Sequence, residues 1–320
     1  MSNFCIQPGE SADSPLSIFI MGPTATGKTD LAIALYNELP AEIISVDSAL
    51  VYKGMDIGSA KPDKRTLANA PHHLIDFIDP RDHYSAGRFR DNAMALMQQI
   101  TASGSMPLLV GGTMLYFNAL QKGMADLPVI DKNVRLQLDQ EQRENGLEAM
   151  YERLRTVDPQ SAGRLHKNDT QRIKRALEVY DSSGKTLSYF WQKQAAFRFP
   201  YQRLKIALMP ADRVGLRLRI TQRFDLMLKQ GFIEEVENLR RRGDLHIGLP
   251  SIRAVGYRQV WAYLDGEYSF DIMREKAIIA TVQLAKRQMT WLRKEPACNF
   301  IDPSQLNTDK VLQKLVALLL

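Results

Sequence analysis

Cysteine is scarce in this chain. Its 320 residues include only two cysteines, Cys5 and Cys298, one near each end. Because there is no C-x-x-C pair and no cluster of cysteine with histidine, we infer neither a zinc site nor a disulfide framework. This usage is typical of a protein kept in a reducing compartment, and we therefore expect a cytoplasmic location.

Long apolar runs are absent as well. No stretch approaches the length of about eighteen apolar residues that a membrane-spanning helix needs. The first residues lack a basic segment followed by an apolar stretch, so we expect no signal peptide and no membrane attachment. The composition, 45% hydrophobic and 24% charged, is that of a globular protein with a sizeable core in one large domain or two.

Charge is unevenly distributed along the chain. Residues 1–100 carry 8 Lys and Arg against 12 Asp and Glu, whereas the other 220 residues carry 34 against 24. The positive excess of the later part indicates a polyanionic partner, although an ordinary solvated basic surface would have the same composition.

Apolar runs of strand length predict a parallel sheet. They occur at 16–21, 42–46, 74–78, 107–110 and 205–209. Near-continuous rather than alternating runs favour strands buried on both faces, and the helical patterns at 29–39 and 88–103 separate them as in an α/β fold. Residues 1–14 are polar and are expected to form a loose tail.

Two helical regions interrupt and follow this sheet. The first, 132–183, has breaks at Gly146, Asp158–Pro159 and Gly184; the second, 212–295, has breaks at Gly231, Gly243, Leu249–Pro250 and Gly266. Because the first region lies between the fourth and fifth strands, we predict an insertion into one sheet. The expected divisions are a first core segment at 15–128, a helical insertion at 129–200, and a core continuation with C-terminal basic helices at 201–320.

A glycine-rich loop follows the first predicted strand with the spacing G-x-x-x-x-G-K-T. Its residues are Gly22, Pro23, Thr24, Ala25, Thr26, Gly27, Lys28 and Thr29. Between a strand and a helix, the two glycines let successive N–H groups point inward, and the helix N-terminus adds its positive end. Lys28 supplies a full charge and the Thr29 hydroxyl can hold a metal ion. The sequence therefore predicts a site for a di- or triphosphate.

Two further polar segments follow predicted strands. Asp47 comes directly after the run 42–46, at the edge where parallel sheets bind ligands. Three roles are open for it: a ligand of Mg²⁺, a general base, or a cap of the next turn. Gly111, Gly112 and Thr113 follow the fourth strand and predict either a second phosphate contact or a plain turn into a helix.

Basic residues gather in three later segments, at 171–175, 253–258 and 286–293. In the last of these, Lys286, Thr290 and Arg293 share one helical face, and Trp291 lies on the adjoining one. Arginine with interleaved aromatic residues suits the phosphates and stacked bases of RNA. The alternative is a solvated face with Trp291 packed into the core.

The motifs together resemble one family, the bacterial tRNA dimethylallyltransferases, also called tRNA isopentenyltransferases or IPP transferases. After the glycine-rich loop they are SVDS at 45–48, GMDIG at 54–58, AKP at 60–62, YSA at 84–86, VGGT at 110–113, SIRAVGYR at 251–258 and AKRQMTWLR at 285–293. The resemblance covers about residues 15–295 and departs mildly at Thr26, where the family often has Ser.

The resemblance implies an α/β core like that of P-loop kinases and a helical insertion that grips the anticodon stem-loop. It implies a monomeric enzyme that uses Mg²⁺ and transfers a dimethylallyl group from dimethylallyl diphosphate to N6 of the adenine just 3′ of the anticodon. By motif, Asp47 is the general base, Lys28, Thr29 and Thr113 hold the diphosphate, and Arg135 joins them. The residues implied to contact tRNA are Asp47, Ser48, Ala49, Leu50, Gln171, Arg172, Ile173, Lys174, Arg175, Arg253, Ala254, Val255, Gly256, Tyr257, Arg258, Lys286, Arg287, Gln288, Met289, Thr290, Trp291, Leu292 and Arg293.

Two rival functions share the phosphate loop. A small-molecule P-loop kinase would bind ATP and use the insertion as a lid, and an RNA-binding ATPase would bind ATP without modifying the RNA. The ligand that the protein retains, dimethylallyl diphosphate or ATP, discriminates between them and the transferase.

Overall fold

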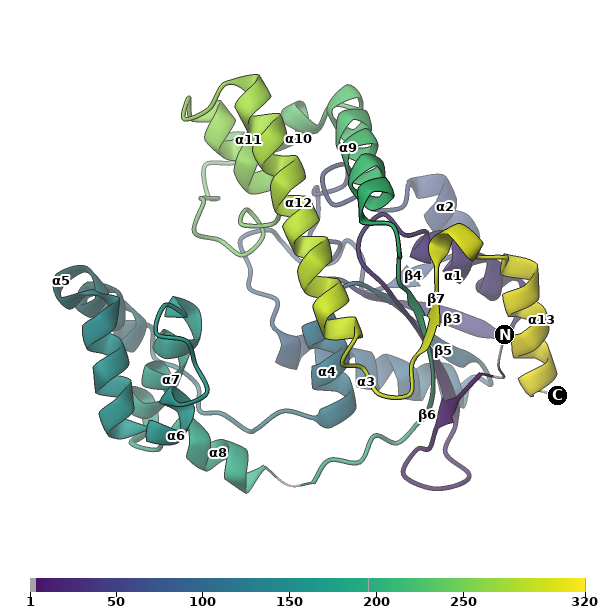
Figure 1. The fold of residues 1–320 in the computed structure, drawn as a ribbon, viewed down its shortest axis with the longest axis horizontal. Helices are drawn as coiled ribbons and strands as arrows, with labels where there is room; N and C mark the ends of the chain where they lie inside the picture. The colour runs from purple at the N-terminus through teal and green to yellow at the C-terminus, as the bar shows by residue number, and fades with distance from the viewer. Residues whose placement is uncertain (1–3, 195, 320) are drawn as a thin grey trace. The chain divides into compact units, whose positions relative to one another are not determined.

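The computed structural model describes residues 4–194 and 196–319 (Figure 1). They form two compact units. The core unit comprises the residues up to 122 and those from 198 onward, and the insertion unit comprises residues 123–197. The division predicted from the sequence is an insertion at 129–200 between core segments at 15–128 and 201–320.

A seven-stranded sheet forms the centre of the core unit within the described residues. Its strands are β1 (Ile6–Gln7), β2 (Leu16–Met21), β3 (Ala41–Val46), β4 (His72–His73), β5 (Met106–Gly111), β6 (Gln202–Leu208) and β7 (Asn299–Ile301). Their order is β1-β6-β2-β5-β3-β4, with β7 also paired to β6, and only the pairing of β1 with β6 is antiparallel. The predicted parallel α/β core is confirmed.

Three predictions at the margins of the sheet need correction. Residues 74–78 do not form a strand, because Leu74 and Asp76 have left-handed backbones with φ of 62° and 56°. Instead the N–H groups of Phe77 and Ile78 donate to Val51 O, at 3.0 and 2.9 Å. The supposedly loose tail contains β1, and β7 has no counterpart among the predicted strands.

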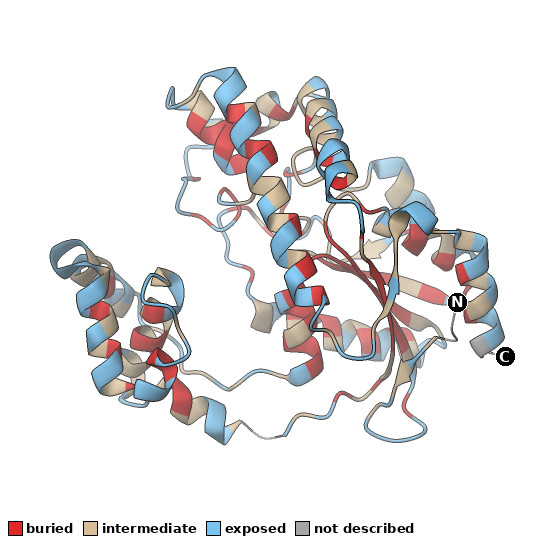
Figure 2. Ribbon diagram, viewed as in Figure 1, coloured by how far each residue is buried: buried red, intermediate tan, exposed pale blue. Residues whose placement is uncertain are grey.

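Helices cover both faces of the sheet. They are α1 (Lys28–Glu38), α3 (Ala86–Ala102), α4 (Met114–Lys122) and α13 (Thr308–Leu319). Ile18 and Ile20 pack in one apolar cluster with α1 and α13. Phe19 points to the other face, where its ring lies 5.3 Å from that of Phe117 on α4. Because both faces are covered, the central strands β2, β3, β5 and β6 are largely apolar, and they are buried along most of their length (Figure 2).

Other helices of the core unit precede the insertion unit or follow β6. They are α2 (Lys64–Asn69), α9 (Arg213–Lys229), α10 (Phe232–Arg241), α11 (Tyr257–Leu264), α12 (Phe270–Leu292) and the 3₁₀ turn η1 (Pro303–Gln305). The predicted breaks at Gly231, Gly243 and Gly266 are confirmed, since each has a left-handed backbone with φ of 96°, 76° and 80°.

The insertion unit is helical and has its own core. Its helices are α5 (Lys132–Val157), α6 (Pro159–Ala162), α7 (Thr170–Ser183) and α8 (Leu187–Lys193). Gly146 interrupts α5 with a φ of 79°, and Gly184 ends α7, as predicted. The buried Asp158 joins two helix starts, because it accepts hydrogen bonds from Ser161 N (3.0 Å) and Ser188 N (3.1 Å). No helix in the described parts of either unit is both long and apolar enough to cross a membrane.

Candidate active site

The register of the sheet places three predicted segments at one edge. Met21 of β2 and Val46 of β3 both lie opposite Gly111 of β5. The next residues along the chain therefore leave the sheet at the same edge: the phosphate loop after β2, Asp47 after β3 and Gly112 after β5. Because β5 lies between β2 and β3, the turn at 111–113 lies between Asp47 and the loop.

The phosphate loop turns through left-handed positions, one of them at a predicted glycine. Ala25 and Gly27 are left-handed, with φ of 62° and 81°. Gly22 is closely surrounded, because a Cβ there would lie 3.0 Å from both Leu208 O and Thr26 Oγ1. Pro23 O accepts from Thr26 Oγ1 at 2.9 Å, so the loop is held by its own side chains.

Lys28 is half-buried beneath this loop, where its Nζ donates to Pro23 O at 2.6 Å. Burial lowers the pKa of its ammonium group to about 8, Asp47 opposes this shift, and Arg223 adds to it. Burial therefore makes the charged form of Lys28 costly, and the nearby Asp47 offsets part of that cost. An anionic ligand would relieve that cost.

Arg223 of α9 is a site residue that sequence reasoning missed. Its Nη1 lies 3.4 Å from Thr24 Oγ1 in the loop. Burial lowers the pKa of its guanidinium, and Asp47 and Asp30 oppose the shift. Arg223 is one of four arginines on α9 and lies about 200 residues from the loop in sequence, so no motif distinguishes it.

Gln288 of α12 ties two of the three segments together. Thr24 N donates to its Oε1 at 3.1 Å, and its Nε2 donates to Gly112 O at 2.9 Å. A Cβ on Gly112 would lie 2.4 Å from that Nε2, so only glycine leaves room for this contact. The side chain assigned to tRNA by motif thus has both ends of its amide engaged within the protein.

Asp47 and Thr113 are linked through Ser48, whose N–H donates to Thr113 Oγ1 at 3.1 Å. Asp47 Oδ1 accepts from Ala49 N at 2.8 Å and from Leu50 N at 3.3 Å, so the capping role left open by the sequence is present. Within the described chain we find no hydrogen bond to Oδ2 of Asp47. That second oxygen leaves a role toward a ligand compatible with the cap.

The basic segments of α11 and α12 are only partly exposed. Arg253, Arg258, Lys286, Arg287, Thr290 and Arg293 are exposed. Trp291 is 42% exposed, so the alternative that it packs into the core is wrong. Met289 and Leu292 are buried, and so is Tyr257, at 0% exposed. The structure therefore corrects the assignment of these last side chains to tRNA, since they pack inside the protein.

In the insertion unit, predicted RNA-binding residues pair with carboxylates. Lys174 contacts Asp139, and Glu178 contacts Arg175 Nη1 at 3.1 Å and Arg135 Nε at 3.7 Å. Their neighbours on α7 differ in exposure: Gln171 and Arg172 are exposed, whereas Ile173 is fully buried. The assignment of Ile173 to tRNA is likewise corrected, because its side chain belongs to the core of the unit.

Comparison with known proteins bears on what this site does. The sequence model of the IPP transferase family matches residues 50–295, and that of the isopentenyl transferase family matches residues 17–81. A tRNA dimethylallyltransferase of Thioalkalivibrio sulfidiphilus is 58% identical over 304 residues, which are 95% of each chain. The tRNA dimethylallyltransferase 2 of Hahella chejuensis is 52% identical over 316 residues, again 95% of each chain.

A solved structure gives the same fold. It is that of a eukaryotic dimethylallyltransferase acting on tRNA, which is 26% identical to this chain with a TM-score of 0.78. The similarity covers 95% of this chain and 78% of that one.

Proposed function

The chain belongs to the IPP transferase family, and on this premise we propose that it transfers a dimethylallyl group from dimethylallyl diphosphate to N6 of the adenine immediately 3′ of the anticodon in tRNA. The family and its two relatives support a dimethylallyl transfer to tRNA. One observation carries the assignment of the site: Lys28 and Arg223 are both held at the phosphate loop with pKa values lowered by burial.

The proposed reaction breaks the C–O bond between the allyl carbon and the diphosphate and forms a bond from that carbon to N6. Negative charge grows on the departing oxygen. Lys28, Arg223, the N–H groups of the loop and the Thr113 hydroxyl are proposed to bind the diphosphate and to stabilise that charge. Groups whose interaction strengthens as the bond breaks lower the barrier, rather than merely improving binding.

Asp47 is the group proposed to take the proton that N6 loses as the new bond forms, because the lone pair of this exocyclic amine is delocalised into the ring and makes it a poor nucleophile. Two backbone N–H groups hold its Oδ1, which fixes the carboxylate and leaves Oδ2 to face the base. The target adenine has to leave its stack to reach this edge of the sheet. Residues 48–50 follow Asp47 directly and are proposed to contact it.

Mg²⁺ is proposed as the metal of the site, with Thr29 as a ligand. Within the described ranges no three His, Cys, Asp or Glu side chains cluster as metal ligands. That fits Mg²⁺, which usually takes one or two protein oxygens, keeps several waters and completes its shell with substrate phosphates. Thr29 is exposed at the start of α1, where its hydroxyl would be one ligand of the ion. When bound there, the ion would neutralise charge on the diphosphate.

We propose that tRNA is bound by the exposed cations Arg253, Arg258, Lys286, Arg287 and Arg293, by Thr290 and Trp291, and by the insertion unit through Gln171, Arg172, Lys174 and Arg175. Arg135 is proposed to reach the diphosphate. We also propose that the protein acts as a monomer and that it works in the cytoplasm. Its low cysteine content and the tRNA named as the substrate of its relatives support the second point.

The test is direct. Purified protein is mixed with unmodified tRNA, Mg²⁺ and labelled dimethylallyl diphosphate, and label in the RNA is counted. We expect label at the adenine 3′ of the anticodon, with diphosphate released. A protein that labels no RNA, retains ATP in preference to dimethylallyl diphosphate and phosphorylates a small molecule would be a kinase instead.

A further inference from the structure

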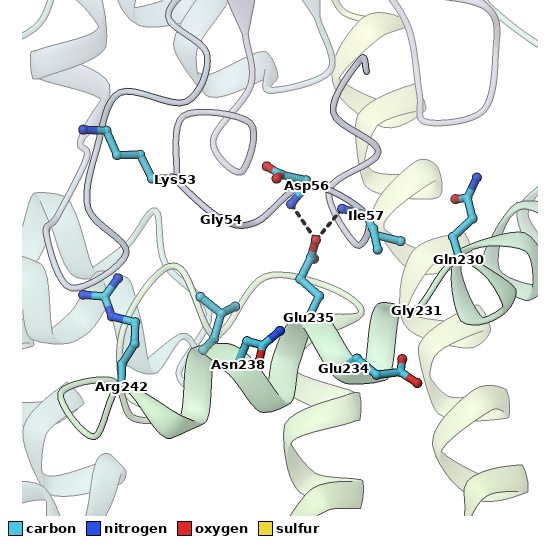
Figure 3. Close-up of a pocket in the computed structure, with 11 residues that line it drawn as sticks. Lys53, Gly54, Asp56, Ile57, Gln230, Gly231, Glu234, Glu235, Asn238 and Arg242 are labelled. Carbon is cyan, nitrogen blue, oxygen red and sulfur yellow. Dashed lines mark hydrogen bonds between the residues drawn. The ribbon is translucent and has the colours of Figure 1, made fainter. Parts of the chain in front are cut away.

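Glu235 of α10 fills a small nest of backbone N–H groups in the segment 54–58. Its Oε2 accepts from Asp56 N at 2.9 Å and from Ile57 N at 2.7 Å, and its Oε1 accepts from Gly58 N at 3.2 Å (Figure 3). The buried Tyr257 completes the arrangement, since its hydroxyl donates to Oε1 at 2.6 Å. A carboxylate that accepts this many hydrogen bonds is a strong, directional attachment point.

The segment also lies directly on an aromatic ring. A Cβ on Gly58 would lie 2.0 Å from Phe232 Cε2, so only glycine allows this approach. The ring of Tyr257 in turn meets that of Phe232 edge to face, with centroids 5.0 Å apart. Gly58 and Tyr257 therefore both contact the ring of Phe232. Because Phe232 belongs to α10, these contacts fix the position of the nest relative to that helix.

A groove of about 630 Å³ lies beside this attachment. It is lined by Lys53, Gly54, Asp56 and Ile57 of the segment and by residues that include Gln230, Glu235 and Asn238 (Figure 3). The attachment therefore stands at the edge of an open groove, where the hydrogen bonds to Glu235 and the contact at Gly58 hold the segment against α10.

A second set of contacts connects the nest to residues 47–50. Lys61, whose side chain is only 4% exposed, donates to Asp56 Oδ1 at 2.5 Å and to Tyr52 O at 2.8 Å. Tyr52 N donates to Ala49 O at 3.2 Å, and Ala49 lies within the turn that Asp47 caps. A shift at the nest would thus be passed by Lys61 and Tyr52 to the segment that carries Asp47.

We propose that Glu235, assisted by Tyr257, is a positioning residue for the transfer: it sets the place of residues 47–50 against the target adenine without touching either substrate. The inference rests on the proposed function, because that function assigns residues 47–50 to the reacting base. A displacement of about 1 Å at a reacting group can cost on the order of 10²-fold in rate, so a loosened anchor should be visible in kinetics.

The variants are E235Q, Y257F and the matched control E234Q. E235Q keeps the shape but turns an N–H₂ group toward backbone donors, and Y257F removes one hydroxyl. Glu234 is the exposed neighbour on the same helix, and its carboxylate makes none of the contacts to the nest (Figure 3). We expect kcat/KM for tRNA to fall about 10- to 100-fold in E235Q and less in Y257F. The affinity for dimethylallyl diphosphate should stay within a few-fold, and E234Q should match the unchanged protein.

A double-mutant cycle with D47N separates positioning from simple loss of stability. If Glu235 acts through Asp47, E235Q should lower kcat in the unchanged protein and add little in a D47N background. Assays run well below the unfolding temperature of each variant exclude unfolding as the cause. Full activity of both E235Q and Y257F under these conditions, or additive losses with D47N, would overturn the inference. Failure of the unchanged protein and of E234Q to label tRNA would instead count against the proposed function.

Discussion

Basic residues in the two units of this protein are held in opposite ways. At the phosphate loop, Lys28 and Arg223 are half-buried, and burial lowers the pKa of both. In the insertion unit, Lys174 lies against Asp139 of the same unit, and its charge is balanced within the protein. The first arrangement is costly until an anion binds, whereas the second is already satisfied. A positive residue near a predicted site therefore has to be judged by the charges that already neutralise it.

The largest effect is expected from the carboxylate beside the buried cations. D47N should lower turnover by on the order of 10²–10⁴, the range for loss of a general base, because the amide cannot accept a proton. Single-turnover kinetics would measure this, with binding of both substrates expected to stay within a few-fold. If D47N lost Mg²⁺-dependent binding of the diphosphate while its chemistry was otherwise intact, Asp47 would be a metal ligand instead.

The next largest effect on turnover is expected at Arg223, which no sequence motif predicted. R223Q should cost on the order of 10²–10³ in turnover, since Arg223 is placed to stabilise charge on the leaving diphosphate. R217Q, on the exposed side of the same helix, is the matched control and should behave like the unchanged protein. Equal activity of the two variants would show that burial at the loop does not mark Arg223 as a functional cation.

A smaller effect is expected where cations meet tRNA at the surface. The triple variant K286Q/R287Q/R293Q removes charges for which no ion pair occurs among the described residues, and R172Q/K174Q/R175Q removes charges partly paired with Asp169, Asp139 and Glu178. Binding of tRNA should weaken more in the first, with a salt slope lower by about 0.7–0.9 for each phosphate that the variant no longer neutralises. Salt titrations with the reverse ranking, or with unchanged slopes, would contradict this comparison.

The smallest effect concerns pH. Lys28 has a pKa lowered to about 8 in the free protein, so it loses its charge as the pH rises through 8. A bound anion favours the charged form, and binding should therefore weaken above that pH, by up to about tenfold at pH 9. Titration calorimetry of dimethylallyl diphosphate between pH 6.5 and 9 would detect it. In K28M the binding should be weaker throughout and flat with pH; a persistent slope would point to another group.

The phosphate loop shows which structural features can be predicted from a few neighbouring residues. Its left-handed positions and its close approach to β6 follow from residues within the motif, because each depends on backbone geometry over a few neighbours. The breaks at Gly146, Gly184 and Gly231 were predictable for the same reason. The strand predicted at 74–78 failed because apolar composition alone does not reveal that Leu74 and Asp76 turn left-handed.

Motif membership did not predict which residues are free to bind. Tyr257, Met289 and Leu292 stand inside segments assigned to tRNA, yet their side chains are buried. Conversely, Arg223 and Glu235 belong to no motif. Arg223 contacts Thr24 and Glu235 contacts Ile57, each from a helix far along the chain. Burial and long-range pairing depend on what packs around a residue, which no window of neighbouring residues contains.

The glycine-rich loop motif, the α/β core with its helical insertion and the family of the chain were all predictable from the sequence. These follow from short-range rules: strand-length apolar runs, glycine at turns, and fixed spacing in contiguous motifs. The folded chain alone shows that β5 lies between β2 and β3, that Gln288 joins the loop to Gly112, and that Arg223 lies against Thr24 of the loop. The physical reason is that desolvation and hydrogen bonding act through space, so groups distant in sequence become partners only once the chain has folded.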